Sequence, residues 1–142
     1  ARYEDRWVQL KPNPDSPCIF TKGLAVHGVL PMPVRHGEGK LVARDAATLQ
    51  RLQDENLIAL QYTHPETGEA TQEHPWNPNG SPLAIAGLTD PTGHILGLMP
   101  HPEAFHHATN HPGWTRGEVA VPGTALFANA VRYLRENPVN HS

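Results

Sequence analysis

The chain has 142 residues, which is enough for one domain or a large part of one, and a net charge of -3. Its eleven Lys and Arg residues are scattered, which excludes the clustered basic face of nucleic-acid binding, and no apolar run approaches the roughly 20 residues that span a bilayer. We therefore expect a protein that binds neither nucleic acid nor membrane. A single cysteine cannot form an internal disulfide, which favours a reducing compartment, so we expect a cytoplasmic protein.

The first part of the chain predicts strands and proline-rich turns. Residues 1–10 read as a strand that is already under way, which suggests a piece of a longer domain. Residues 11–17 form a loop rich in turn-forming residues. Residues 24–34 are apolar but contain prolines, each of which removes a donor from a strand ladder, so an edge strand or a bulge is expected.

A sharp turn and a capped helix are expected next. The sequence HGEG at residues 36–39 places two glycines around Glu38, which lets the backbone turn sharply and approach another group closely. Residues 40–43 predict a short strand. Asp45 is a suitable N-cap for a helix over residues 46–55, whose leucines recur at one-turn spacing.

The middle of the chain predicts two hairpins. A strand over residues 57–62 is expected to pair with a polar strand at residues 70–73. Residues 74–82 contain three prolines, two asparagines and a glycine, and therefore form a loop. Residues 83–88 and 95–99 are apolar and are separated by a strong turn signal, which predicts two further strands.

The end of the chain predicts a long loop and a helix. Residues 104–122 are rich in His, Gly and Pro, and loops of that length inside a compact domain are usually functional or mobile. Residues 123–136 show the periodicity of an amphipathic helix. Its apolar face is expected to comprise Leu126, Phe127, Ala130, Val131 and Leu134.

The most informative local pattern is GLMPHPE at residues 97–103. An apolar strand leads directly into His101 and Glu103, and residues two apart on an extended segment point the same way. The carboxylate can therefore orient the imidazole, as the third member of a relay of nucleophile, base and orienting carboxylate. The tripeptide HPE also occurs at residues 64–66, where turn residues surround it, and we interpret that copy as a solvated turn.

Three motifs occur together in order: HGEGK at residues 36–40, PWNPNGSPLAIAGLTDPTG at residues 75–93 and LGLMPHPEAF at residues 96–105. In this order they resemble the class I glutamine amidotransferase domain of phosphoribosylformylglycinamidine synthase, over nearly the whole chain. The resemblance implies a flavodoxin-like α/β sandwich of which residues 1–142 are the carboxy-terminal portion, with a mixed sheet, hairpins and flanking helices. It also implies hydrolysis of glutamine to glutamate and ammonia by a Cys–His–Glu triad in purine biosynthesis.

The same resemblance assigns residues and partners. His101 corresponds to the catalytic base and Glu103 to its partner. The other candidates for lining the site are His36 and Glu38, although the two glycines around Glu38 equally suit a turn needed for backbone reasons alone. Asn79, Gly80 and Ser81 could line the mouth of the site or contact the synthetase, but a rigid turn bounded by prolines is the alternative interpretation and is slightly favoured. The glutaminase is expected to need no metal or cofactor, and to pass ammonia to a synthetase domain or subunit that uses ATP and Mg.

The nucleophile of that family is missing from this chain. It belongs to a Gly-x-Cys-x-Gly turn in an amino-terminal half that would precede these motifs, whereas Cys18 follows a proline and has no glycine within two positions. We expect Cys18 to be a buried or edge thiol. The chain alone is therefore not expected to turn over glutamine.

Two other functions remain open at this point. The chain could be a half-domain without a nucleophile that acts as a binding or regulatory module on the synthetase. It could also be a metal-binding module that uses His106, His107 and His111. Neighbouring histidines rarely reach one ion, so we favour a polar loop, in which Trp114 and Arg116 are candidates for contact with a partner.

Overall fold

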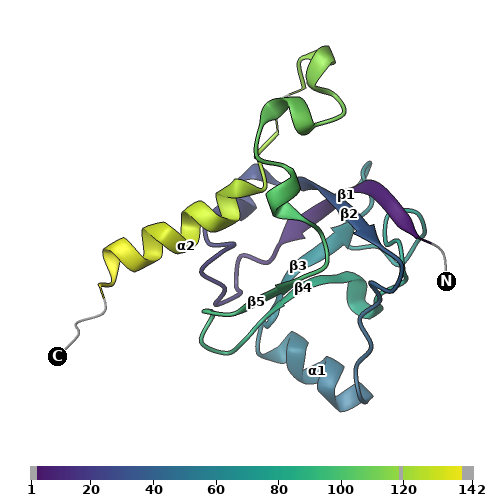
Figure 1. The fold of residues 1–142 in the computed structure, drawn as a ribbon. Helices are drawn as coiled ribbons and strands as arrows, with labels where there is room; N and C mark the ends of the chain where they lie inside the picture. The colour runs from purple at the N-terminus through teal and green to yellow at the C-terminus, as the bar shows by residue number, and fades with distance from the viewer. Residues whose placement is uncertain (1–2, 119, 139–142) are drawn as a thin grey trace.

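The computed structural model describes residues 3–118 and 120–138, which form a five-stranded sheet and two α-helices (Figure 1). The strands are β1 (Glu4–Pro12), β2 (Leu30–His36), β3 (Ile58–Thr63), β4 (Ile85–Thr89) and β5 (Leu96–Leu98). The helices are α1 (Ala46–Asp54) and α2 (Thr124–Glu136). Short 3-10 turns occur at Leu24–His27, Pro82–Ala84, Pro102–Ala104, Ala108–Asn110 and Trp114–Arg116.

The strand order is β2-β1-β3-β4-β5, and every hydrogen-bonded pair among the described residues is antiparallel. The α/β class is confirmed, but the expected mixed sheet differs from this arrangement. β2 and β3 are both antiparallel to β1 and therefore run parallel to each other, with α1 in the connection between them. They share no ladder because β1 lies between them. The proline-containing β2 lies at an edge of this sheet, as its sequence predicts.

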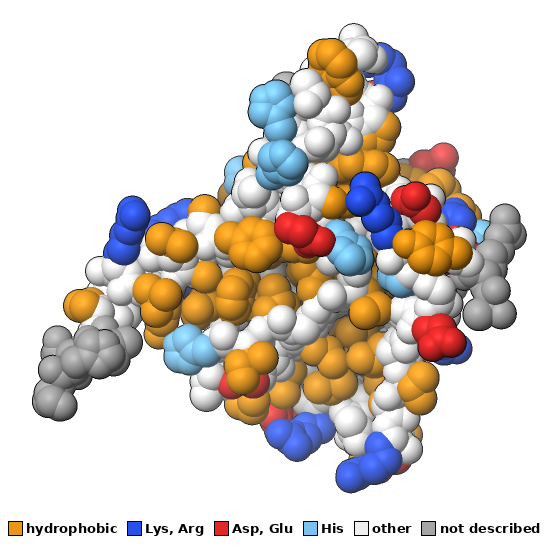
Figure 2. Space-filling view, in the orientation of Figure 1, with side chains coloured by type: hydrophobic (Ala, Val, Ile, Leu, Met, Phe, Trp, Pro, Cys, Tyr) orange, Lys and Arg blue, Asp and Glu red, His pale blue; other side chains and the backbone are white. Residues whose placement is uncertain are grey.

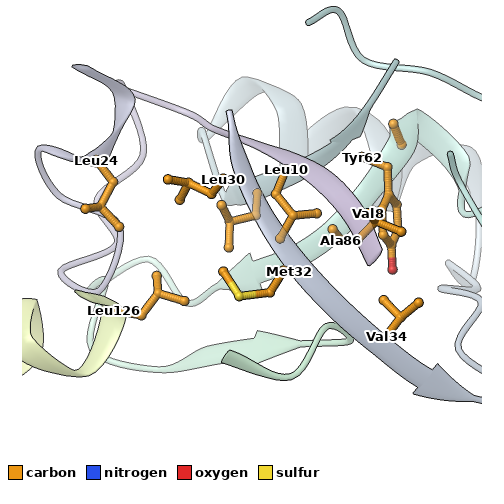
Figure 3. Packing of buried hydrophobic residues seen from close by; sticks show 11 residues of the cluster. Val8, Leu10, Leu24, Leu30, Met32, Val34, Tyr62, Ala86 and Leu126 are labelled. Carbon is orange, nitrogen blue, oxygen red and sulfur yellow. The ribbon is translucent and has the colours of Figure 1, made fainter. Parts of the chain in front are cut away.

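The hydrophobic core lies on one face of β1 and β2. Val8 and Leu10 of β1 lie opposite Met32 and Leu30 of β2, and Leu126 of α2 packs against the same cluster (Figure 3). Each of these side chains is almost completely buried, so apolar burial is the main force that joins α2 to the sheet. The other buried members of the cluster are Leu24, Val34, Leu60, Tyr62, Ala84 and Ala86.

Most predicted elements are confirmed, and their local causes are visible. β1 confirms the expected first strand, whose first two residues lie outside the described part of the chain. Asp45 caps α1, since its Oδ1 accepts a hydrogen bond from Thr48 N at 2.7 Å. The hydrogen bonds from Thr48 hold the pKa of the Asp45 carboxyl below its ordinary value. The strands expected around residues 57–62, 83–88 and 95–99 correspond to β3, β4 and β5.

Two expected strands do not form. Residues 40–43 are not in a strand, because Leu41 N donates to the side chain of Ser81 and not to a neighbouring strand. The expected return strand at residues 70–73 is reduced to an isolated bridge between Thr63 and Ala70. The loop that follows supplies a hydrogen-bond partner that a neighbouring strand would otherwise provide, since the buried Asn77 side chain donates to Thr71 O at 3.1 Å.

α2 confirms the predicted terminal helix, but most of its apolar face is exposed. Leu126 is only 2% exposed, whereas Phe127, Val131 and Leu134 are 47%, 48% and 56% exposed. The start of α2 packs on the sheet through Leu126, and further along the helix Asn129 donates to the carbonyls of Phe20 and Lys22 and Tyr133 contacts His94 of the β4–β5 turn. Within the described residues, neither helix has the length and apolar character needed to cross a membrane.

Candidate active site

The segment after β5 bridges two separate strands of the sheet. Met99 N donates to Ala86 O of β4 at 3.1 Å, and His101 N donates to Pro33 O of β2 at 2.8 Å. β4 and β2 are separated in the sheet by β3 and β1, so the sheet must curl for one segment to reach both. His101 therefore follows β5 in the chain, and its main chain is anchored to the edge strand β2.

His101 and Glu103 are in direct contact. His101 Nδ1 lies 2.6 Å from Glu103 Oε1, and the hydrogen bond from His101 holds the pKa of the Glu103 carboxyl below its ordinary value. With Nδ1–H donating to the carboxylate, Nε2 keeps its lone pair for another group. The side chains are 40% and 62% exposed, so the pair is accessible from outside this chain. This arrangement suits a general base, the His101 imidazole, that is held in place by the carboxylate of Glu103.

His101 and Glu103 form part of the lining of an open hollow of about 320 Å³. Besides His101 and Glu103, its lining includes Phe20, Met99 and Phe127. Figure 2 shows hydrophobic side chains gathered on this face between the sheet and α2, beside acidic and histidine side chains. A second hollow, of about 280 Å³, adjoins the first. Its lining comprises Glu38, Lys40, Leu41, residues 85–88 and residues 97–99, so it shares Leu98 and Met99 with the first.

The HGEG motif forms the end of β2 and the turn after it. His36 Nδ1 lies 3.0 Å from the side-chain amide of Asn79, and its Nε2 is buried without a hydrogen-bond partner. Burial lowers the pKa of the His36 imidazole, and the nearby His101 acts in the same direction. Glu38 is exposed, whereas Gly39 is buried. Of the residues predicted to line the site, His36 therefore lies near His101 in a largely covered position.

The structure brings the NPNGS loop to the HGEG turn. Ser81 is fully buried, and its Oγ accepts a hydrogen bond from Leu41 N at 3.1 Å. Gly80 has a left-handed φ of 64° at an exposed position, a conformation that favours glycine. Asn79 and Ser81 thus contact the turn around Glu38, while Gly80 serves the loop's own backbone.

The lowered pKa of His36 predicts a pH-dependent stability. Because the folded pKa lies below the ordinary value of about 6.5, the unfolded chain binds this proton more readily. The contribution of His36 is therefore complete above about pH 6.5 and is lost as pH falls toward the folded pKa. The urea midpoint should fall less between about pH 7.5 and about pH 5.5 in His36→Gln than in the wild type. Equal pH slopes would contradict this assignment.

Two residues that the sequence did not single out support the site. Arg35, which precedes His36, lies near enough to Glu103 for its charge to help lower the pKa of that carboxyl. Asn77 is 1% exposed and holds both Ser81 N and Ser81 O through its side chain. An asparagine within a proline-rich loop was the available sequence signal for Asn77, because asparagine side chains often bond the backbone of turns. No sequence signal pointed to Arg35.

The His-rich segment projects from the rest of the molecule (Figure 1). The His111 ring packs on Trp7 with centroids 5.3 Å apart, and His107 Nδ1 accepts from Thr109 N. Within residues 3–118 and 120–138, no group of three His, Cys, Asp or Glu side chains is arranged to hold a metal ion. Trp114 and Arg116 are exposed, as a partner contact would require.

Two further predictions are confirmed by burial and backbone bonding. Cys18 is 1% exposed, so its thiol is enclosed as a small hydrophobic group. The first HPE copy forms a turn, in which Gly68 N donates to His64 O at 2.8 Å and Glu66 is exposed. The exposed imidazole–carboxylate pair of this chain therefore has no accessible thiol within the described residues.

The profile of the CobB/CobQ-like glutamine amidotransferase domain matches residues 1–134. The chain belongs to this family. Membership agrees with the motif resemblance and with the position of His101 and Glu103 after a strand.

Relatives of the chain carry the name phosphoribosylformylglycinamidine synthase subunit PurQ. A protein of Methanococcus maripaludis strain C5 is 39% identical over 147 residues, covering 95% of this chain and 53% of the relative. One of Dehalococcoides mccartyi strain ATCC BAA-2266 is 37% identical over 138 residues, covering 96% of this chain and 51% of the relative. The chain spans about half the length of the curated relatives it matches.

Proposed function

We propose that this chain is the carboxy-terminal portion of a glutaminase that hydrolyses glutamine to glutamate and ammonia for the synthesis of phosphoribosylformylglycinamidine in purine biosynthesis. The observation that carries the proposal is the 2.6 Å contact between His101 Nδ1 and Glu103 Oε1, at an exposed position after β5. The names of the relatives and the family membership support the same reaction.

His101 acts as the base in this proposal. Its Nε2 takes the proton of a cysteine thiol supplied by the rest of the domain, and the thiolate attacks the amide carbon of glutamine. The tetrahedral oxyanion collapses to a thioester as His101 returns the proton to the departing ammonia. Water then attacks the thioester as His101 takes one of its protons, and His101 passes that proton to the departing sulfur, which releases glutamate and restores the thiol. Glu103 holds the imidazole tautomer and stabilises the imidazolium.

The missing thiol comes from an amino-terminal half of the same domain, which completes a flavodoxin-like sandwich. The burial of Cys18 supports this part of the proposal, because its enclosed sulfur is not accessible to the exposed imidazole of His101. The exposed apolar residues Phe127, Val131 and Leu134 also support it, since apolar surface of this kind on a single helix face is usually covered by another element. Phe127 further lines the hollow that holds His101.

Glutamine and the synthetase occupy different parts of the proposed enzyme. The exposed Glu38 lines the hollow that adjoins the one at His101. A carboxylate in this position suits contact with the α-ammonium group of glutamine. Ammonia passes to a synthetase, as a separate subunit or a fused domain, which uses ATP and Mg. The exposed Trp114 and Arg116 of the projecting segment are the proposed contacts with that partner.

The test replaces His101 by alanine in the complete glutaminase together with its synthetase. Synthesis with glutamine should fall by about a thousandfold or more, because the thiol loses its base, while synthesis with free ammonia should continue. His64→Ala is the matched control, since it alters the other HPE copy, and it should leave both rates unchanged. Loss of both activities in His101→Ala, or of neither, would refute the assigned reaction.

A second candidate is a binding or regulatory half-domain that docks on the synthetase. The burial of the only cysteine favours it, because this chain then offers no nucleophile of its own. The two functions are separated by mixing the chain with the remaining half of the domain. Recovery of glutamine hydrolysis supports the glutaminase, whereas binding to the synthetase without hydrolysis supports the regulatory module.

A further inference from the structure

The end of β2 and the loop at residues 77–81 are joined by a compact hydrogen-bonded unit. With its oxygen toward the HGEG turn, the Asn79 amide accepts from Gly39 N at 2.7 Å and from His36 Nδ1 at 3.0 Å, while its NH2 group donates to Pro78 O. One side-chain oxygen therefore holds both ends of the turn. We call this unit of His36, Gly39 and Asn79 the clasp.

Close packing also holds the clasp in place. A Cβ at position 39 would lie 2.3 Å from His36 Cε1, so the turn closes over the ring only because residue 39 is glycine. The neighbouring Leu41 N is held by the buried Ser81 Oγ at 3.1 Å. The turn is thus attached to the 77–81 loop at three backbone or ring positions, and Glu38 and Lys40 remain exposed.

The clasp selects one form of the His36 ring. Donation from Nδ1 to the Asn79 oxygen leaves Nε2 as an acceptor, and this nitrogen is buried without a partner. The buried Glu4 of β1 and the catalytic candidate His101 lie close enough for their charges to influence the pKa of the His36 ring. A neutral ring with its proton on Nδ1 fits this enclosure, because a second proton on Nε2 would have no acceptor.

We propose that Asn79 and His36 are positioning residues of the glutaminase, and that their clasp holds the HGEG turn so that Glu38 stands at the hollow adjoining His101. This inference rests on the proposed function. It gives Asn79 a different task from direct contact with glutamine, since its oxygen is already used by His36 and Gly39.

The clasp should affect binding of glutamine more than the chemical step. The HGEG turn reaches the hollow through Glu38, whereas His101 has its own anchor in the bond from its N–H to Pro33 O. Loss of the clasp therefore releases Glu38 without freeing the His101–Glu103 pair. A contact made equally in the bound substrate and the transition state changes KM and leaves kcat nearly constant.

The experiment compares Asn79→Leu with Asn79→Asp in the complete glutaminase and its synthetase. Leucine has a similar size but no acceptor, so the KM for glutamine should rise by about tenfold while kcat changes by less than about threefold. Aspartate keeps an oxygen for Gly39 N and His36 Nδ1, so it should restore the KM to within about threefold of the wild type. Synthesis with free ammonia should be equal in all three proteins.

A second measurement does not depend on activity. Nitrogen-15 NMR of histidine-labelled wild-type enzyme near neutral pH should show the His36 proton on Nδ1, and Asn79→Leu should change that tautomer. A wild-type proton on Nε2, an unchanged KM in Asn79→Leu, or a failure of aspartate to restore KM would each overturn the clasp. A wild-type enzyme that cannot hydrolyse glutamine would overturn the proposed function, which separates the two failures.

Discussion

Glu103→Gln should lower the kcat for glutamine hydrolysis by about a hundredfold to ten-thousandfold in the complete enzyme. The amide has the size of the carboxylate, so the fold should be retained. It cannot stabilise the imidazolium that forms when His101 takes the thiol proton, and its NH2 group facing His101 Nδ1 favours the unsuitable tautomer. Steady-state release of glutamate measures the loss.

Glu66→Gln is the matched control for that experiment. Glu66 occupies the corresponding place in the first HPE copy, where the residue is exposed in a turn. Its replacement should leave kcat within about twofold, because no element of the site contacts it. If Glu103→Gln retained full activity, the 2.6 Å contact with His101 would be structural only, and the role of Glu103 in orienting His101 and stabilising its imidazolium would be withdrawn.

Gly123→Ala should destabilise the protein by about 2 kcal/mol or more. A Cβ at this position would lie 2.2 Å from Pro102 O and 2.6 Å from Pro102 Cα, and both are backbone atoms that cannot rotate away. Gly123 N also donates to Phe105 O at 2.8 Å. The start of α2 is therefore packed directly against the segment that carries His101 and Glu103, so glutaminase activity should fall together with stability.

Urea unfolding of the protein that contains residues 1–142 measures this effect, and Gly97→Ala serves as its control. A Cβ at position 97 would meet only Leu88 O at 4.0 Å, which is ordinary contact. Its stability should be unchanged or slightly higher, since replacing glycine at a compatible position restricts the unfolded chain. Equal stability of Gly123→Ala and the wild type would show that the segment at Pro102 can move to accept a methyl group.

Local signals in the sequence were sufficient for most individual elements. Asp45 followed by an amphipathic stretch predicts α1, because the cap bond to Thr48 N spans only three residues. The prolines of β2 predict an edge strand, because a missing N–H affects the ladder of any sheet. The contact between His101 and Glu103 was also predicted from their spacing of two residues, but the predicted extended segment is wrong: Glu103 lies in the 3-10 turn at Pro102–Ala104 that follows His101.

The strands at residues 40–43 and 70–73 show where local patterns were insufficient. Their backbone groups had two competing sets of partners, and the choice depended on a loop far along the chain. Ser81 takes the N–H of Leu41 across 40 residues, and Asn77 takes Thr71 O from a buried position. Strand propensity cannot anticipate such bonds, because it describes preference for a pleated surface without saying which surface is present.

By itself, the sequence determined the order of the main elements, the buried state of Cys18 and the pairing of His101 with Glu103, since each follows from composition or short spacing. Tertiary structure alone decided what surrounds that pair. The curl of an antiparallel sheet brings β2 to the segment after β5, and this contact places the HGEG turn beside His101. Such long-range contacts depend on the packing of the whole sheet, which no local pattern of residues specifies.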